Sequence, residues 1–148
     1  MQICAQHGKA LANYANPNVK VLVVCNPTNT CALITAKYAA HVIPVQNITA
    51  LTRLDHNRAV HQLAARHGVS AGQVTGVFVW GNHSFTQFAD ASIASVDGHT
   101  VPFDGHDMSF IDTVRQRGGA VVAVRNNTAT LSAAKGAADH MHDWWNGM

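Results

Sequence analysis

The sequence predicts a mixed chain in which an α/β part comes first and an α+β part follows. Residues 19–25 form a nearly unbroken apolar run rich in β-branched side chains, which is typical of a strand covered on both faces in a parallel sheet. Helical apolar spacing flanks this run, and Asp97-Gly98 gives a hairpin signal farther along the chain. With 148 residues, of which 47% are hydrophobic, the chain can bury a sizeable core and suits one domain or one large piece of a domain.

The first part is expected to run from helix to strand to helix. Residues 8–15 carry apolar side chains at helical spacing, and an Asn-Pro-Asn sequence at 16–18 breaks that helix. The polar turn at residues 26–30 ends the strand and can cap a second helix over residues 31–41. Pro44 then separates this unit from the next.

The middle of the chain predicts a long helix followed by a short strand. Asn47 or Thr49 can cap a helix that runs to about His67, and Gly68 is a natural stop. Residues 77–80 are apolar and β-prone, so we expect a strand there.

The last part predicts a hairpin and two helices. Residues 93–96 and 99–101 are expected to pair across Asp97-Gly98. We expect Asp107 to cap a helix that Gly118-Gly119 stops near Arg117. The Ala-rich residues 128–145 predict one further long helix.

Composition excludes several classes of function. The net charge is only +2 and no basic block is present, so the chain lacks the electrostatic pattern of a protein that binds nucleic acid or an anionic membrane. No apolar run is long enough to span a bilayer, and the first residues do not resemble a signal peptide. We therefore expect a cytoplasmic protein with neither a nucleic-acid partner nor a membrane partner.

The sequence shows no metal-ligand pattern. The three cysteines, Cys4, Cys25 and Cys31, form no Cys-x-x-Cys pair, and we expect them to be buried, reduced thiols. A histidine metal site is a weaker alternative, because the spacings put no two ligands cleanly on one helix face and no cluster of acids or cysteines accompanies them. The histidines considered for it are His56, His61, His67, His140 and His142.

Four residues have a common chemical logic. Asp55 and Arg58 are three apart and share a helix face, and His83 follows the strand expected at 77–80. A histidine held by a carboxylate can transfer protons near neutral pH, and an arginine fork binds a substrate carboxylate. Asn26, at the end of the first strand, can contact a substrate oxygen or a ribose. Taken alone, Asp55 and Arg58 also suit a local ion pair, and His83 a structural role.

Three motifs and their order resemble NAD-dependent malate dehydrogenases, and among them the cytosolic-type branch. These are VVCNPTNT at residues 23–30, LTRLDHNRA at 51–59 and WGNHS at 80–84. The SAAK sequence at 132–135, with the Asp-His and Asp-Trp pairs at 139–140 and 143–144, is similar to the same branch. The resemblance extends from about Gly8 to the last residue.

The resemblance implies a fold and an organisation. It implies the end of a Rossmann-like parallel sheet plus the start of an α+β catalytic domain, truncated at both ends. Residues 1–46 are then the remnant of the NAD-binding domain and residues 47–148 a partial substrate and catalytic domain. It also implies a homodimer that acts on malate and oxaloacetate.

The resemblance implies a role for each matching residue. His83 is the proton acceptor and donor, Asp55 orients it, and Arg58 binds the substrate carboxylate. Asn26 binds substrate and cofactor. The remaining residues implied to contact NAD are Val24, Cys25 and His7.

The sequence also departs from the family pattern. It has no Gly-rich phosphate turn, and Cys25 stands in place of the usual Gly. His7 replaces a Gln that contacts NAD, and Ala129 replaces a Ser of the nicotinamide pocket. These departures leave open the alternative that the chain is a catalytically inactive malate dehydrogenase fragment that acts as a dimerisation or interaction module.

Overall fold

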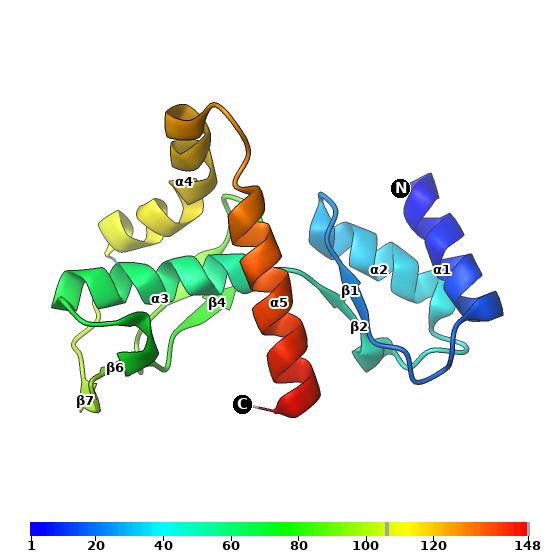
Figure 1. Ribbon diagram of the computed structural model, residues 1–148, viewed down its shortest axis with the longest axis horizontal. Coiled ribbons are helices and arrows are strands. Elements are labelled where there is room, and N and C mark those ends of the chain that lie inside the picture. The colour runs from blue at the N-terminus through cyan, green and yellow to red at the C-terminus, as the bar shows by residue number, and fades with distance from the viewer. Residues whose placement is uncertain (106, 148) are drawn as a thin grey trace. The chain divides into compact units, whose positions relative to one another are not determined.

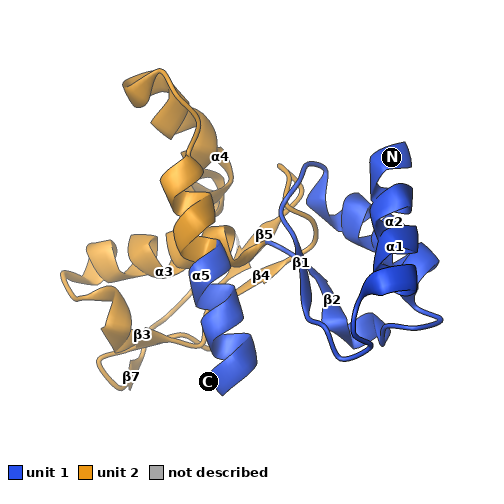
Figure 2. Cartoon of the chain, turned by 45° about the vertical axis from the view of Figure 1, so that its right-hand side comes forward, with its two compact units in different colours: residues 1–51, 137–148 blue, residues 52–136 orange. Residues whose placement is uncertain are grey.

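The computed structural model describes residues 1–105 and 107–147, which form two compact units (Figures 1 and 2). Unit 1 comprises residues 1–51 and 137–148, and unit 2 comprises residues 52–136. The chain is an α/β structure with a parallel strand pair and flanking helices, as the sequence predicts. The predicted domain boundary between residues 46 and 47 stays a prediction.

Unit 1 is built on two parallel strands, β1 (Val21–Val23) and β2 (Ile48–Ala50). Helices α1 (Gln2–Tyr14) and α2 (Thr28–Ala39) pack together beside them, and the 3-10 helix η1 (Val45–Asn47) leads into β2 (Figure 1). The core consists of small and branched side chains, namely Cys4, Val23, Cys31, Ala32, Ala36, Ala39, Ile43 and Ile48.

The second half of α5 (Thr130–Asn146) belongs to unit 1 and contacts the strand pair. The ammonium of Lys20, just before β1, lies 4.4 Å from the ring centroid of Trp144. The Thr49 hydroxyl and His140 Nε2 are hydrogen-bonded at 3.1 Å. These two contacts explain why the last turns of α5 join a unit from which they are distant in sequence.

The described residues of unit 2 form two long helices, a 3-10 helix, the first turns of a further helix and five short strands around an apolar core. Helix α3 (Arg53–His67) and helix α4 (Met108–Arg125) pack together, and the first turns of α5 complete the unit. The 3-10 helix η2 (Ala71–Gln73) precedes β3 (Val74–Thr75). The remaining strands are β4 (Phe78–Trp80), β5 (Phe88–Asp90), β6 (Ser95–Val96) and β7 (His99–Thr100). One sheet has the strand order β3-β6-β7, and a second sheet pairs β4 with β5. All of these pairs are antiparallel.

Several predicted elements are confirmed by the structure. Asp97 and Gly98 both have positive φ, at 50° and 79°, as the hairpin between β6 and β7 requires. Gly68 ends α3 in the left-handed conformation at φ 66°. The Asp107 carboxylate accepts the Phe110 N–H at 2.9 Å and so caps α4.

Other predictions of boundaries are wrong. The first helix begins at Gln2, and the first strand is limited to Val21–Val23. The helix predicted from residue 47 or 49 begins only at Arg53, because residues 48–50 pair with β1 as strand β2. Gly118-Gly119 does not stop α4, which continues to Arg125, because a glycine in a helix interior costs only about 1 kcal/mol and does not break the hydrogen-bond ladder; the helix ends at Asn126, whose φ of 50° is left-handed. Cys25 is exposed, whereas Cys4 and Cys31 are buried as expected.

Gly8 allows α1 and α2 to approach closely. A Cβ at this position would lie 2.6 Å from the Thr35 carbonyl oxygen and 2.8 Å from Tyr38 Cβ. Gly119, also in a helix, has open space around the equivalent position. The two glycines therefore form a matched pair for a test of packing.

We expect Gly8→Ala to destabilise the protein by about 1–3 kcal/mol through overpacking. Gly119→Ala is expected to stabilise it by up to about 1 kcal/mol, because alanine is the better helix former and meets no neighbour. Urea unfolding followed by circular dichroism measures both changes. A Gly8→Ala variant as stable as Gly119→Ala would contradict the close helix packing.

Among the described residues, none of the helices combines the length and apolar character that crossing a bilayer demands.

Candidate active site

Asp55 lies at the centre of a polar cluster in unit 2. It is in the first turn of α3 and is fully buried. Its Oδ2 contacts His83 Nδ1, and its Oδ1 accepts a hydrogen bond of 3.1 Å from an Arg58 guanidinium nitrogen. One buried carboxylate thus joins two residues that the sequence places on different elements.

His83 lies in the loop that follows β4 and reaches Asp55 across 28 residues of sequence. The contact with Asp55 requires a proton on Nδ1, which leaves Nε2 as the nitrogen that can accept or release a proton. The hydrogen bond to Asp55 raises the pKa of His83; partial burial and the Arg58 charge act in the opposite direction. The cluster therefore stabilises the protonated imidazole while Asp55 fixes its orientation.

Local sequence determines where Asp55 lies. Thr52 is the N-cap of α3, so Asp55 falls in the first helical turn, where a negative charge is favoured by the helix dipole. Gly136 allows α5 to pack directly against this turn, since a Cβ there would lie 2.9 Å from Leu54 N. The result is a buried carboxylate on a rigid helix start.

Arg58 combines an ion pair with an unused hydrogen-bond donor. Its side chain is 10% exposed and lies against Asp55. Within residues 1–105 and 107–147, its Nε is buried without a hydrogen-bond partner. A buried guanidinium N–H without a partner is costly, and a bound carboxylate is the group whose geometry satisfies it.

Arg58 lines a cleft of about 360 Å³ between α3, α4 and the first turns of α5. Arg117 and Lys135 also line it, so the described lining carries three permanent cations and no carboxylate. Gly118 leaves space beside the guanidinium, since a Cβ there would lie 3.9 Å from an Arg58 terminal nitrogen. The other lining residues are Leu54, Asn57, His61, Gln62, Thr113, Val121, Leu131 and Ser132. This lining is suited to an anion.

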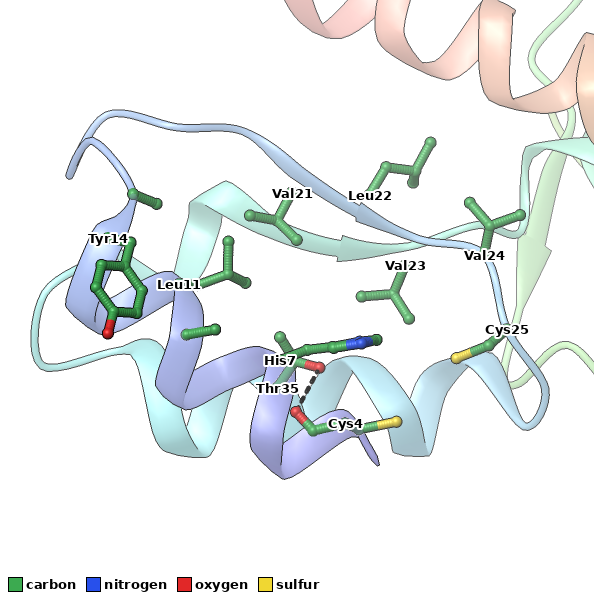
Figure 3. Close-up of a pocket in the computed structure, with 12 residues that line it drawn as sticks. Cys4, His7, Leu11, Tyr14, Val21, Leu22, Val23, Val24, Cys25 and Thr35 are labelled. Carbon is green, nitrogen blue, oxygen red and sulfur yellow. Dashed lines mark hydrogen bonds between the residues drawn. The ribbon is translucent and has the colours of Figure 1, made fainter. Parts of the chain in front are cut away.

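The residues predicted to contact a cofactor lie in unit 1, around a separate pocket of about 710 Å³ (Figure 3). His7 on α1 and Val24 and Cys25 at the end of β1 all line it. Asn26 follows them in the exposed turn before α2. The structure thus groups three of the four cofactor residues in one pocket.

The chemistry of this pocket fits only part of a dinucleotide. Its lining is mostly aliphatic, which suits the flat faces of a nicotinamide or adenine ring. None of its described lining residues is a lysine or an arginine, so a pyrophosphate would need groups from elsewhere. The pocket is therefore a fit for the ring and ribose part of NAD.

Sequence reasoning missed Arg117 as a cleft residue and noted Lys135 only within the SAAK motif. Both lie on helices whose cleft-facing side is decided by the packing of α4 and α5 against α3. Neither residue has a local motif that marks its role.

Comparison with known proteins gives a consistent picture. Residues 52–148 match the family model of the lactate/malate dehydrogenase alpha/beta C-terminal domain. The cytoplasmic malate dehydrogenase of Caenorhabditis elegans is 48% identical over 153 aligned residues, covering 97% of this chain and 46% of the worm protein. The chain thus spans about half the length of the curated relatives it matches.

Two solved structures show the same fold over nearly the whole chain. Malate dehydrogenase from Naegleria fowleri matches with a TM-score of 0.89 and 42% identity, covering 97% of this chain and 46% of that one. Trichomonas vaginalis lactate dehydrogenase, solved in complex with NADH and oxamate, matches with a TM-score of 0.88 and 34% identity, covering 97% of this chain and 45% of that one. The likeness therefore includes both units.

Proposed function

The chain belongs to the lactate/malate dehydrogenase family, and on this premise we propose that it carries out, or carries the central residues for, the reversible NAD-dependent oxidation of (S)-malate to oxaloacetate. The observation that carries the proposal is the buried Asp55 carboxylate, which contacts both His83 and Arg58. A proton carrier and a carboxylate-binding group thus share one anchoring residue.

In malate oxidation, His83 accepts the hydroxyl proton of the substrate at Nε2 and becomes an imidazolium. Asp55 holds the Nδ1 proton and stabilises the positive ring, which is consistent with the raised pKa of His83. In the reverse direction, His83 returns that proton to the oxygen. When bound, NAD(H) supplies the two-electron chemistry, and His7, Val24 and Cys25 are the residues that would hold it.

Arg58 binds the substrate carboxylate through parallel N–H donors and so orients the reacting carbon. Asn26 is proposed to contact a substrate oxygen and the cofactor. Relatives named as malate dehydrogenases support malate as the substrate. Relatives named as cytoplasmic enzymes support a cytoplasmic location, which we propose for this chain.

The test is NADH oxidation by the purified chain with oxaloacetate as substrate and pyruvate as the comparison. We expect turnover with oxaloacetate that His83→Asn lowers by about 10²–10⁴-fold, because proton transfer at Nε2 is lost. His99→Asn is the matched control, since His99 is exposed in β7, outside the cluster. Equal turnover in the His83→Asn and parent chains would exclude the proposed role.

The second candidate is an inactive dimerisation module, proposed because β1 pairs on one edge only among the described strands. The pocket lining without lysine or arginine also favours weak cofactor binding. A folded homodimer that binds no NADH would support this candidate against the enzyme. Sedimentation with and without NADH separates the two.

A further inference from the structure

Three thiols from three different elements meet in unit 1. Cys4 lies in the first turn of α1, Cys25 in the turn after β1, and Cys31 in the first turn of α2. All three are free, and their sulfur atoms lie within 4.8 Å of one another. Figure 3 shows the sulfurs of Cys4 and Cys25 directed toward each other.

The separation of the sulfurs suits a shared metal ion. Zn–S bonds of about 2.3 Å at tetrahedral angles place two sulfurs about 3.8 Å apart. Thiols within 4.8 Å need to move by only about 1 Å to reach this geometry, which small side-chain torsions supply. The same three sulfurs can also surround a three-coordinate soft ion.

The backbone that carries the thiols is held in place. The Thr35 hydroxyl on α2 donates to the Cys4 carbonyl at 3.5 Å and links the two helices (Figure 3). The Thr28 hydroxyl donates to the Val23 carbonyl at 2.9 Å and fixes the turn that contains Cys25. A donor set on fixed elements loses little conformational freedom when it binds an ion.

The surroundings favour thiolates once an ion is present. Cys4 and Cys31 are both in N-terminal helical turns, where the helix dipole stabilises negative charge. Cys25 is exposed and lines the open pocket, which gives an ion access.

We propose that Cys4, Cys25 and Cys31 together bind one thiophilic d¹⁰ cation, Zn²⁺ or Cu⁺, as three thiolates. Soft thiolate ligands select these two ions among the common biological metals. For Zn²⁺ the fourth position is taken by water or by His7, which lies one helical turn after Cys4 and lines the same pocket. Cys25 and His7 also line the pocket proposed to hold NAD, so the test of this site measures metal binding in the absence of cofactor and does not use activity.

The experiment titrates the reduced full chain with Zn²⁺ and, separately, with Cu⁺ in the absence of oxygen. Elemental analysis gives the stoichiometry, and Co²⁺ used as a probe reports thiolate ligation through its sulfur charge-transfer absorption. We expect one ion per chain. Each single Cys→Ser change is expected to weaken binding by more than about 100-fold, since loss of even a supporting partner costs about 10–100-fold.

The control variants assign the ligands. Thr30→Ser, next to Cys31, is expected to bind as the parent does. His7→Ala weakens Zn²⁺ binding and leaves Cu⁺ binding unchanged if His7 is the fourth ligand; equal Zn²⁺ binding assigns that position to water. Both outcomes keep the three-thiolate site.

Two results would overturn the proposal. One is metal binding no tighter in the parent than in the triple Cys→Ser variant. The other is a disulfide between two of the three cysteines, found by peptide mapping of the freshly purified chain. This result overturns the proposal if the reduced protein forms the disulfide again when an ion is offered, and binds no ion. In that case two of the three single variants lose the bond and the third retains it.

Discussion

Replacing Asp55 by asparagine is expected to destabilise the protein by about 3 kcal/mol and to lower the pKa of His83. The variant leaves the Arg58 charge partly buried without its carboxylate, and breaking a buried pair on one side is costly. Because the hydrogen bond to Asp55 is the main cause of the raised His83 pKa, its loss removes that shift. Urea unfolding and NMR titration of His83 measure the two effects.

The same change is expected to alter the pH dependence of stability. The pKa of His83 is raised in the folded protein, so the stabilisation it provides is fully present below the unfolded pKa of about 6.5. That stabilisation is lost as the pH rises through the folded pKa. Asp55→Asn should remove this loss, and the stability of the variant should vary less above pH 6.5.

Asp112→Asn is the matched control, because Asp112 also pairs with an arginine three residues later, Arg115, at 3.2 Å. The Asp112 carboxylate is 44% exposed, so its ion pair is screened by water. We expect a change of at most about 0.5 kcal/mol. If the two variants lose equal stability, the buried position of Asp55 has no special effect.

Replacing Arg58 by lysine is expected to weaken the binding of oxamate, which carries one carboxylate, by about 100-fold or more. Lysine keeps the charge beside Asp55 but cannot form the two parallel hydrogen bonds of a guanidinium with a carboxylate. Each such charge-assisted bond contributes about 1.5–3 kcal/mol, so the loss of one already approaches this factor. Calorimetric titration with oxamate, which does not react, measures the binding without turnover.

Arg125→Lys serves as the control for this prediction. Arg125 is exposed at the end of α4 and does not line the cleft. Its replacement is expected to leave oxamate binding unchanged. Equal loss in both variants, or no loss in either, would exclude Arg58 as the carboxylate ligand.

Much of the candidate site could be predicted from local patterns. Asp55 and Arg58 share a helix face because they are three residues apart, and the structure shows them paired at 3.1 Å. Gly68, Asp97 and Asp107 act at element ends through properties that each residue has in isolation, namely tolerance of positive φ or a side-chain acceptor. The motifs at residues 23–30, 51–59 and 80–84 also identified the family that the comparisons show.

One failure comes from a segment whose state depends on a distant partner. Residues 48–50 form β2 because they pair with β1 as a parallel strand. The presence of that partner cannot be predicted from residues 48–50 themselves. The glycines at 118–119 remain helical although each costs about 1 kcal/mol relative to alanine, and α4 ends only at Asn126, in the left-handed conformation.

The sequence by itself determined the family, the types of most elements and the residues able to move a proton or bind a carboxylate. The tertiary structure shows His83 in contact with Asp55, as the resemblance implies, and it alone decided that the Arg58 Nε is buried without a partner among the described residues. It also decided that three scattered cysteines meet. The physical reason is that backbone propensity and side-chain chemistry are local, whereas distance, burial and charge pairing arise only when separate elements pack together.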